Sequence, residues 1–273
     1  MTAHAPQVPA RPIAPWRLIA AVGLVGLALA GCQRKGTADI TGSVPGPVQA
    51  SPAAWKREAD LWQPRFETNP GDVNAALRYA RALRALDQKA QAVAVLQQAA
   101  IRSPNYAELL GAYGKALADV GRYKEAAEAL GRAHAPERPD WRILSAQGAV
   151  ADQMGDHARA QSYYEAALKL VPQEASVMSN LGLSYALAKR LPEAERWLRD
   201  AADAPKADAR VRQNLALVLS LQGKFAEAEA VLTRDLSPED TAALMADLRG
   251  LVSQPNSWRA IKRADANAKP TRI

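Results

Sequence analysis

The sequence predicts an all-α fold in which pairs of helices stack into a solenoid. The first observation is a small residue that recurs every 34 positions, at Ala80, Gly114, Gly148, Gly182 and Ala216. The second is an abundance of alanine, the strongest helix former. The third is that no long run alternates between apolar and polar residues, as a half-buried strand would require. Such a solenoid offers an extended surface to partners, because each unit contacts only its neighbours.

The composition excludes several functional classes. The 273 residues carry a formal net charge of +7, from 35 basic and 28 acidic side chains. The two signs are interspersed, as on a solvated helical surface, whereas a nucleic-acid-binding chain more often shows a basic stripe with aromatics. A single cysteine excludes an internal disulfide and a cysteine-rich zinc site. His4, His134 and His157 lie too far apart for metal-ligand spacing. We therefore expect no metal, no cofactor and no nucleic-acid partner.

Residues 1–31 have the composition of a secretory signal peptide. Arg11 and Arg17 precede an apolar run over 18–30. A membrane-spanning helix needs about 20 apolar residues, so this run is too short to span and matches the apolar region of a signal.

The signal ends in Leu29, Ala30, Gly31 and Cys32, which resembles the lipobox of bacterial lipoproteins. The resemblance implies cleavage before Cys32 and lipid attachment to its sulfur. Several acyl chains on one residue would anchor the protein firmly, since each buried methylene contributes about 0.8 kcal/mol. Gln33 follows the cysteine where inner-membrane lipoproteins carry Asp, which favours the outer membrane, facing the periplasm. The alternative is an ordinary signal peptide with a chance cysteine.

Two segments separate the anchor from the repeats. Residues 32–50 contain glycine and proline and little periodicity, which indicates a flexible linker. Residues 51–72 carry Trp55, Trp62 and Phe66 at helical spacing, and we interpret them as an N-terminal capping helix. A partner-binding face is the alternative for this helix.

Residues 73–242 divide into five repeats of 34 residues, with the small residue as position 8 of each. The repeats are 73–106, 107–140, 141–174, 175–208 and 209–242. Position 20 is always alanine, and small residues at positions 8 and 20 let the two helices of a repeat cross closely. Gly121, Gly155 and Gly223 stand at position 15, where a left-handed residue ends the first helix. This pattern is that of the tetratricopeptide repeat, a helix–turn–helix unit.

Two residues depart from the pattern, and a cap follows the last repeat. Gln147 puts a polar group at a usually apolar position of repeat three. Asp235 replaces a small residue late in repeat five, as expected where no further repeat packs. Residues 243–273 then read as a C-terminal capping helix, ended by Pro255, and a basic tail.

The first helices of the repeats line the concave face in this fold, and they supply the candidate partner-binding residues. These are Arg81, Arg84, Lys115, Arg142, Asn180, Arg210 and Asn214. The first three repeats lean basic there, whereas the last two are more polar and apolar, which suits a bound helix or extended peptide. Asn180 and Asn214 share position 6, which some repeat proteins use to clamp a terminal carboxylate and many others use without that role. Ordinary solvated faces remain the alternative for the whole set.

No pattern indicates an enzyme. The sequence lacks a nucleophile elbow, a glycine-rich phosphate loop and paired carboxylates in a pocket, so we expect no catalytic residue and no small-molecule substrate. We interpret Glu193, Glu195, Glu227 and Glu229 as solvated helix charges.

Five segments of the sequence resemble one particular family of repeat proteins. They are 113–118, 133–142, 179–187, 210–219 and 254–258. Together with the lipobox they resemble the TadD family of tight-adherence (Flp) pilus-assembly lipoproteins. The resemblance covers roughly residues 70–260. It implies a periplasm-facing scaffold that binds the outer-membrane secretin, or a neighbouring component, in a pilotin-like role. A lipoprotein of the β-barrel assembly machinery and an adaptor of peptidoglycan enzymes remain as alternatives.

Overall fold

A computed structural model describes residues 51–253 of the chain. They belong to one compact unit, Gln49–Ile273. The signal peptide over 1–31, lipidation of Cys32, the linker over 32–50 and the basic tail after 253 lie outside the described residues.

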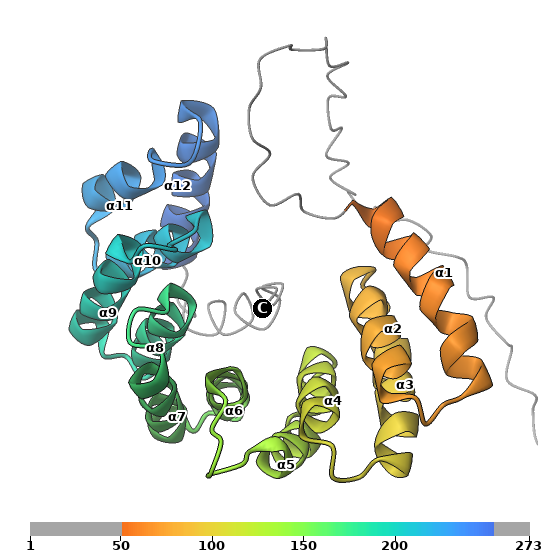
Figure 1. Cartoon of the computed structure of the whole chain (residues 1–273). Helices are drawn as coiled ribbons and strands as arrows, with labels where there is room; N and C mark the ends of the chain where they lie inside the picture. The colour runs from red at the N-terminus through yellow and green to blue at the C-terminus, as the bar shows by residue number, and fades with distance from the viewer. Residues whose placement is uncertain (1–50, 254–273) are drawn as a thin grey trace, which may run out of the picture. The chain divides into compact units, whose positions relative to one another are not determined.

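Residues 51–253 form twelve α-helices and no strand, which confirms the all-α prediction (Figure 1). The helices are α1 (Pro52–Thr68), α2 (Val73–Ala85), α3 (Lys89–Arg102), α4 (Ala107–Asp119), α5 (Tyr123–Ala133), α6 (Trp141–Gln153), α7 (His157–Leu170), α8 (Ala175–Leu187), α9 (Leu191–Asp203), α10 (Ala209–Leu221), α11 (Phe225–Leu232) and α12 (Pro238–Ser253).

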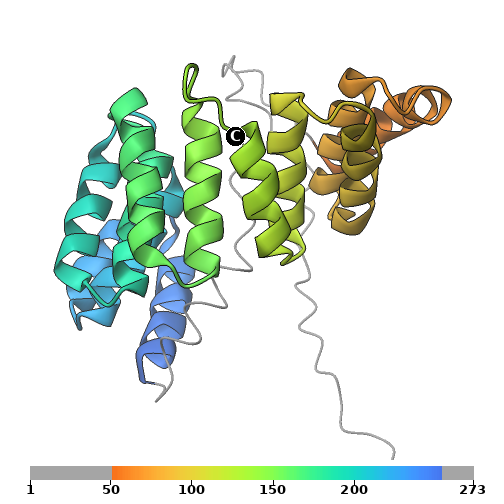
Figure 2. The ribbon, with the colours of Figure 1, turned by 90° about the horizontal axis from the view of Figure 1, so that it is seen from below.

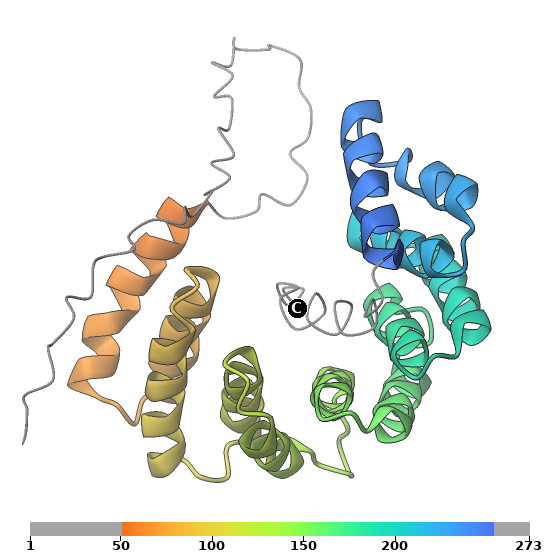
Figure 3. The same ribbon diagram turned by 180° about the vertical axis from the view of Figure 1, so that it is seen from behind.

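The helices stack as consecutive pairs in two layers. Helices α2, α4, α6, α8 and α10 form an inner layer, and α3, α5, α7, α9 and α11 form an outer layer (Figures 1 and 3). Seen from below, neighbouring helices lie side by side along the stack (Figure 2). Short turns join the helices of a pair, so the two run antiparallel, as in an αα-hairpin. The first helix of every repeat therefore presents one face to the same side of the stack.

Local sequence signals explain where three of the five inner helices begin. The side chains of Asp72, Asp140 and Asp208 accept hydrogen bonds from backbone N–H groups in the first turns of α2, α6 and α10. A carboxylate at this position satisfies amide hydrogens that have no partner within the helix, and it complements the positive end of the helix dipole.

The turn within each pair needs a left-handed residue at position 15. Gly121, Gly155 and Gly223 have φ angles of 78°, 85° and 76°, as predicted. Asp87 and Lys189 occupy the same position in repeats one and four, with φ angles of 63° and 62°. The turn therefore keeps its geometry in all five repeats, although only glycine adopts it without a steric penalty.

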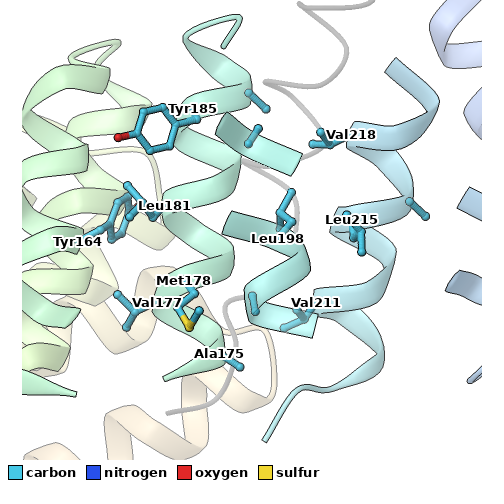
Figure 4. Close-up of a cluster of buried hydrophobic side chains, with 14 of the residues drawn as sticks. Tyr164, Ala175, Val177, Met178, Leu181, Tyr185, Leu198, Val211, Leu215 and Val218 are labelled. Atoms are coloured by element: carbon cyan, nitrogen blue, oxygen red, sulfur yellow. The ribbon is translucent and has the colours of Figure 1, made fainter. Parts of the chain in front are cut away.

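Close packing explains the small residue at position 8. A Cβ atom on Gly114 would lie 2.6 Å from Leu130 Cγ, and one on Gly148 would lie 2.6 Å from Tyr164 Cε1. Leu130 and Tyr164 both stand at position 24, on the second helix of the same repeat. The side chain at position 24 thus occupies the space that a larger residue at position 8 would need. Figure 4 shows the corresponding layer around Tyr164, Leu181 and Leu198.

The hydrophobic core consists of two clusters that meet at α6. Ile143 and Val150 pack with helices α1 to α5, whereas Leu144 and Ala151 pack with helices α7 to α12. Helix α6 therefore contributes apolar side chains to both clusters, and it is the element through which the two parts of the core join.

The two residues that departed from the pattern have different environments. Gln147 is buried, and among the described residues its Oε1 atom has no hydrogen-bond partner. Asp235 forms an ion pair with Arg212 of α10, so it contributes a polar tie within repeat five. Helix α12 begins at Pro238, because the side chain of Ser237 accepts a hydrogen bond from the N–H of Asp240 at 3.1 Å.

Candidate functional site

The inner layer lines a groove with a volume of about 1270 Å³. It extends from Trp55 of α1 to Arg210 of α10. Six of the seven candidate residues line it, namely Arg81, Arg84, Lys115, Arg142, Asn180 and Arg210. Asn214 is the exception, since it does not belong to the groove wall. The structure therefore brings most of the candidate set to one surface.

The centre of the basic part of this groove is Lys115, on α4. Burial lowers the pKa of its ammonium group, and the nearby positive charges of Arg84 and Arg142 lower it further, against an opposing effect of Asp140. The structure gives Lys115 no ion pair with any of the residues from 51 to 253. The groove thus holds a half-buried cation whose environment disfavours its charge.

Arg84 has a defined partner one repeat further along the stack. Its Nε atom lies 2.6 Å from Asp119 Oδ2, and the two side chains are 27% and 10% exposed. The pair joins α2 to α4 and fixes the guanidinium at the groove wall. Arg84 therefore raises the potential near Lys115 less than a bare cation would.

Two further arginines of the groove lie over indole rings. The Arg81 guanidinium stands 5.2 Å from the ring centroid of Trp55, and that of Arg142 stands 4.5 Å from Trp141. Such cation–π contacts orient a side chain while leaving its N–H groups able to donate to a ligand. Arg81 and Arg142 are both exposed.

The far end of the groove carries a separate arginine. The Nε atom of Arg210, on α10, is buried and has no hydrogen-bond partner within the described part of the chain. Ser176, Asn180, Leu183 and Leu187 of α8 also line this end, and all four are uncharged. The predicted division into a basic and a more neutral sector is therefore visible in the groove wall.

The two asparagines at position 6 connect neighbouring repeats. Asn214 Nδ2 donates to Ser179 Oγ at 3.0 Å, and Asn180 Nδ2 donates to Ser145 Oγ at a longer 3.5 Å. Both bonds join a residue of one inner helix to the inner helix before it. This recurring bond gives both asparagines a structural role, as the ordinary interpretation of position 6 supposes.

Sequence reasoning missed a buried polar cluster beside the groove. Asp152, whose side chain is 5% exposed, accepts hydrogen bonds from His157 Nδ1 and from Ser184 Oγ, each at 2.8 Å. The cluster joins α6, α7 and α8. Its signal was an aspartate at position 12 followed five residues later by a histidine across the turn, which spacing alone does not distinguish from surface charges.

This cluster contains the residue types of a catalytic triad in a different arrangement. The Ser184 hydroxyl donates to the carboxylate and not to a ring nitrogen of His157. No imidazole is thus placed to take the serine proton, and the relay that activates a nucleophile is not formed. We interpret the cluster as a tie between repeats three and four.

The interpretation of Glu195 as a solvated charge is wrong. Its carboxylate is 13% exposed and accepts hydrogen bonds from Arg199, Gln222 and Lys224 at 2.7, 2.9 and 2.7 Å. Burial raises its pKa, but the three donors outweigh this effect and bring the pKa down to about 2. A carboxylate in the outer layer therefore ties repeat four to repeat five. The spacing of residues within one helix cannot predict such a contact, because its donors come from the next repeat.

Neither a membrane-spanning helix nor a metal-binding cluster occurs within residues 51–253. In this part of the chain no helix has the length and apolar character needed to cross a membrane. The same residues contain no group of three or more histidine, cysteine, aspartate or glutamate side chains that could hold a metal ion.

A tetratricopeptide-repeat family profile matches residues 69–140 and 145–209, which is half of the chain. A second profile of the same repeat matches residues 209–234. The chain belongs to the tetratricopeptide-repeat family. The solenoid predicted from the 34-residue spacing is therefore confirmed as a tetratricopeptide-repeat solenoid.

Several solved tetratricopeptide-repeat structures share this fold. PilW, described as a widely conserved type IV pilus biogenesis factor, superposes with a TM-score of 0.62 at 19% identity, over 70% of this chain and 91% of PilW. PilF of Pseudomonas aeruginosa gives a TM-score of 0.53 at 20% identity, over 78% of this chain and 90% of PilF.

The same repeat also occurs in an unrelated assembly. The APC/C Cut9–Hcn1 structure gives a TM-score of 0.57 at 20% identity, over 78% of this chain and 40% of that one. None of the curated protein sequences matches the chain. At these identities the likenesses show the fold alone.

Proposed function

We propose that this protein is a lipid-anchored tetratricopeptide-repeat scaffold that assists the assembly of Flp-type (type IVb) pili. The observation that carries the proposal is the continuous groove of about 1270 Å³ across five repeats, lined by side chains suited to a protein partner. The fold of PilW, a pilus biogenesis factor, supports the same class of function. The segments that resemble the TadD family supply the specific system.

The partner in this proposal is the outer-membrane secretin or a neighbouring Tad component. The groove is formed by rigid helices that pack on two hydrophobic clusters, so it exists before the partner arrives. A preformed surface loses little conformational entropy on binding. The mechanism is therefore docking, with localisation or oligomerisation of the partner as its result and no catalytic step.

The proposed anchor is a lipid on Cys32, which would hold the scaffold at the outer membrane facing the periplasm. The linker over 32–50 would let the groove sit on the order of 20–25 Å from the membrane surface, as expected for a flexible chain of this length. Anchor and groove act together in this arrangement, since the secretin is itself a membrane component.

The first experiment is co-purification of the native, membrane-anchored protein, with mass spectrometry of the proteins that remain bound. We expect the secretin or other Tad components. Recovery of β-barrel assembly proteins or of cell-wall hydrolases instead would contradict the pilus assignment and leave the fold unaffected.

A Cys32→Ser variant tests the anchor separately. We expect it to be released from the membrane and to lose pilus assembly, whereas a Ser43→Ala variant in the same linker retains both. Full pilus assembly by the soluble Cys32→Ser protein would show that the anchor is dispensable.

A further inference from the structure

Among the candidate basic residues Arg81, Arg84, Lys115 and Arg142, only Arg84 forms an ion pair within residues 51–253. We call Arg81, Arg84, Lys115 and Arg142 the cationic sector. Arg84 is held by Asp119, and Arg81 and Arg142 lie over Trp55 and Trp141. Lys115 forms no ion pair with the described residues, and it is the most central of the four along the stack.

Two acidic groove residues, Asp119 and Asp140, form no ion pair with Lys115, although the charge of Asp140 partly stabilises its ammonium group. Asp119 pairs with Arg84, and Asp140 accepts the backbone N–H of Arg142 at 2.8 Å as the N-cap of α6. A half-buried ammonium group is unfavourable unless an anion compensates it. The position beside Lys115, flanked by two guanidinium groups, is therefore complementary to one carboxylate from outside the protein.

Apolar side chains also line the groove alongside the cationic sector. Leu77, Ala112, Ala146 and Ala149 line the groove between the basic side chains. A ligand that suits this surface alternates acidic and apolar side chains, as an extended peptide does. A nucleic acid suits it less, because its continuous phosphates would approach the acidic Glu108 and Asp140, which also line the groove.

The chain's own C-terminal sequence lacks this complementarity. Residues 254–273 contain five basic side chains and one acidic side chain, Asp265. A segment of this composition would be repelled by the cationic sector. The occupant must come from another protein.

We propose that the cationic sector binds an acidic, extended segment of a partner protein, with one of its carboxylates received by Lys115 between Arg84 and Arg142. This inference rests on the proposed function insofar as the groove is the partner site, and it adds the chemistry of the segment that is bound. The neutral end of the groove, near Leu183 and Leu187, then receives the less charged continuation of the segment.

The test uses the full chain, purified in detergent, and two fluorescent peptides. One peptide of about twelve residues alternates glutamate with leucine and alanine, and the other carries glutamine in place of every glutamate. Fluorescence anisotropy should show binding of the acidic peptide that is at least tenfold tighter than that of the glutamine peptide. Raising the salt concentration should weaken only the acidic peptide.

Lys115→Gln is the decisive variant. It should reduce the affinity for the acidic peptide about tenfold and bring it close to that of the glutamine peptide. Lys115→Arg should retain the preference. Lys169→Gln makes the same charge change on the exposed face of α7, outside the groove, and should have no effect. The unfolding midpoint of each variant, measured alongside, separates loss of binding from loss of structure.

Three outcomes would overturn the inference. They are equal affinity for both peptides, an acidic-peptide affinity that survives Lys115→Gln, and tighter binding of a single-stranded oligonucleotide that Lys115→Gln abolishes. The co-purification experiment distinguishes this failure from failure of the proposed function. If Tad components remain bound to Lys115→Gln, the proposed function stands and the cationic sector is not their binding site. If the protein binds the acidic peptide through Lys115 but no Tad component co-purifies with it, the inference about the cationic sector stands and the pilus role is wrong.

Discussion

Repeats one and two (α2 to α5) and repeats three to five (α6 to α11) pack their helices alike but join neighbouring repeats by different polar contacts. In the first region the contact is the partly exposed ion pair between Arg84 and Asp119 at the groove. In the second region the inner helices are joined by hydrogen bonds, as between Asp152 and Ser184 and between Asn214 and Ser179. Ion pairs join repeats four and five there as well, but they lie in the outer layer, away from the groove. The apolar packing of the repeat is thus shared, whereas the polar residues are free to differ.

This difference follows the chemistry of the groove. Basic side chains line the groove over the first three inner helices, and the tie between the first two of them, α2 and α4, is ionic. Over α8 the wall is uncharged, and there the ties are hydrogen bonds of serine hydroxyls, from Ser184 to the Asp152 carboxylate and from Asn214 to Ser179. The residues that join neighbouring repeats lie on the same inner helices as the residues that line the groove. The sequence of these helices therefore determines both the contacts between repeats and the charge of the groove wall. Four predictions follow from the comparison, from the largest effect to the smallest.

Removal of the buried tie should have the largest effect on stability. Asp152→Ala leaves the fully buried hydroxyl of Ser184 and the ring of His157 without their acceptor. We expect a loss of roughly 2–4 kcal/mol in the free energy of unfolding, measured with urea. Asp119→Ala breaks the ion pair with Arg84, whose guanidinium is 27% exposed and can be hydrated, so we expect a smaller loss of about 1–2 kcal/mol. Equal losses of unfolding free energy in the two variants would mean that the polar contacts of the two regions contribute equally to stability.

Crowding of the shared packing site should destabilise both regions. Gly148→Ala and Gly114→Ala each place a Cβ atom about 2.6 Å from the side chain at position 24. We expect a destabilisation of roughly 1–3 kcal/mol for either variant, measured by thermal or urea unfolding. Gly131→Ala, on α5 with open space around its Cβ direction, should instead stabilise by up to about 1 kcal/mol through helix propensity. A loss in only one region would show that the packing differs after all.

The neutral tie of the second region should contribute less than the buried carboxylate. Asn214→Ala removes the hydrogen bond to Ser179, whose hydroxyl is fully buried. The expected loss is about 1 kcal/mol, read from the urea midpoint. Asn74→Ala is the matched control, because Asn74 is exposed and bonds only to Arg78 on its own helix. Equal losses of unfolding free energy in the two variants would mean that the bond between repeats contributes no more than a bond within one exposed helix.

Glu195 should make the second region sensitive to acid. Its pKa in the folded state is about 2, below the ordinary value of 4.5, because three donors hold the carboxylate despite its burial. The stability that it provides is therefore complete above pH 4.5 and is lost as the pH falls toward 2. We expect Glu195→Gln to be less stable than the wild type by up to about 1 kcal/mol at pH 6.

Unfolding with urea at several pH values checks this behaviour. The difference between wild type and Glu195→Gln should shrink as the pH is lowered from 4.5 and should vanish near pH 2. A difference that stayed constant over this range would mean that the charge of Glu195 does not contribute. The same titration of Asp119→Ala gives the comparison with the first region.

The amino-acid sequence by itself determined the fold class, the repeat length and most of the groove wall. The reason is that these features are periodic. A small residue at position 8, alanine at position 20 and glycine at position 15 each answer a steric demand that recurs every 34 residues. Once the period is known, the face on which Arg81, Lys115 and Arg142 lie follows from helix geometry.

Only the tertiary structure decided which polar side chains meet. The bond from Ser184 to Asp152, the bonds from Asn180 and Asn214, and those from Gln222 and Lys224 to Glu195 each join residues 27 to 35 positions apart, on different repeats. Rotamer choice and the space left by neighbours select such partners, and neither is periodic in sequence. The same holds for Lys115, which forms no ion pair within residues 51–253, because Asp119, four residues further along α4, pairs instead with Arg84 of α2. Steric demands that recur every 34 residues therefore determine the scaffold, whereas contacts between repeats determine which charged side chains are paired.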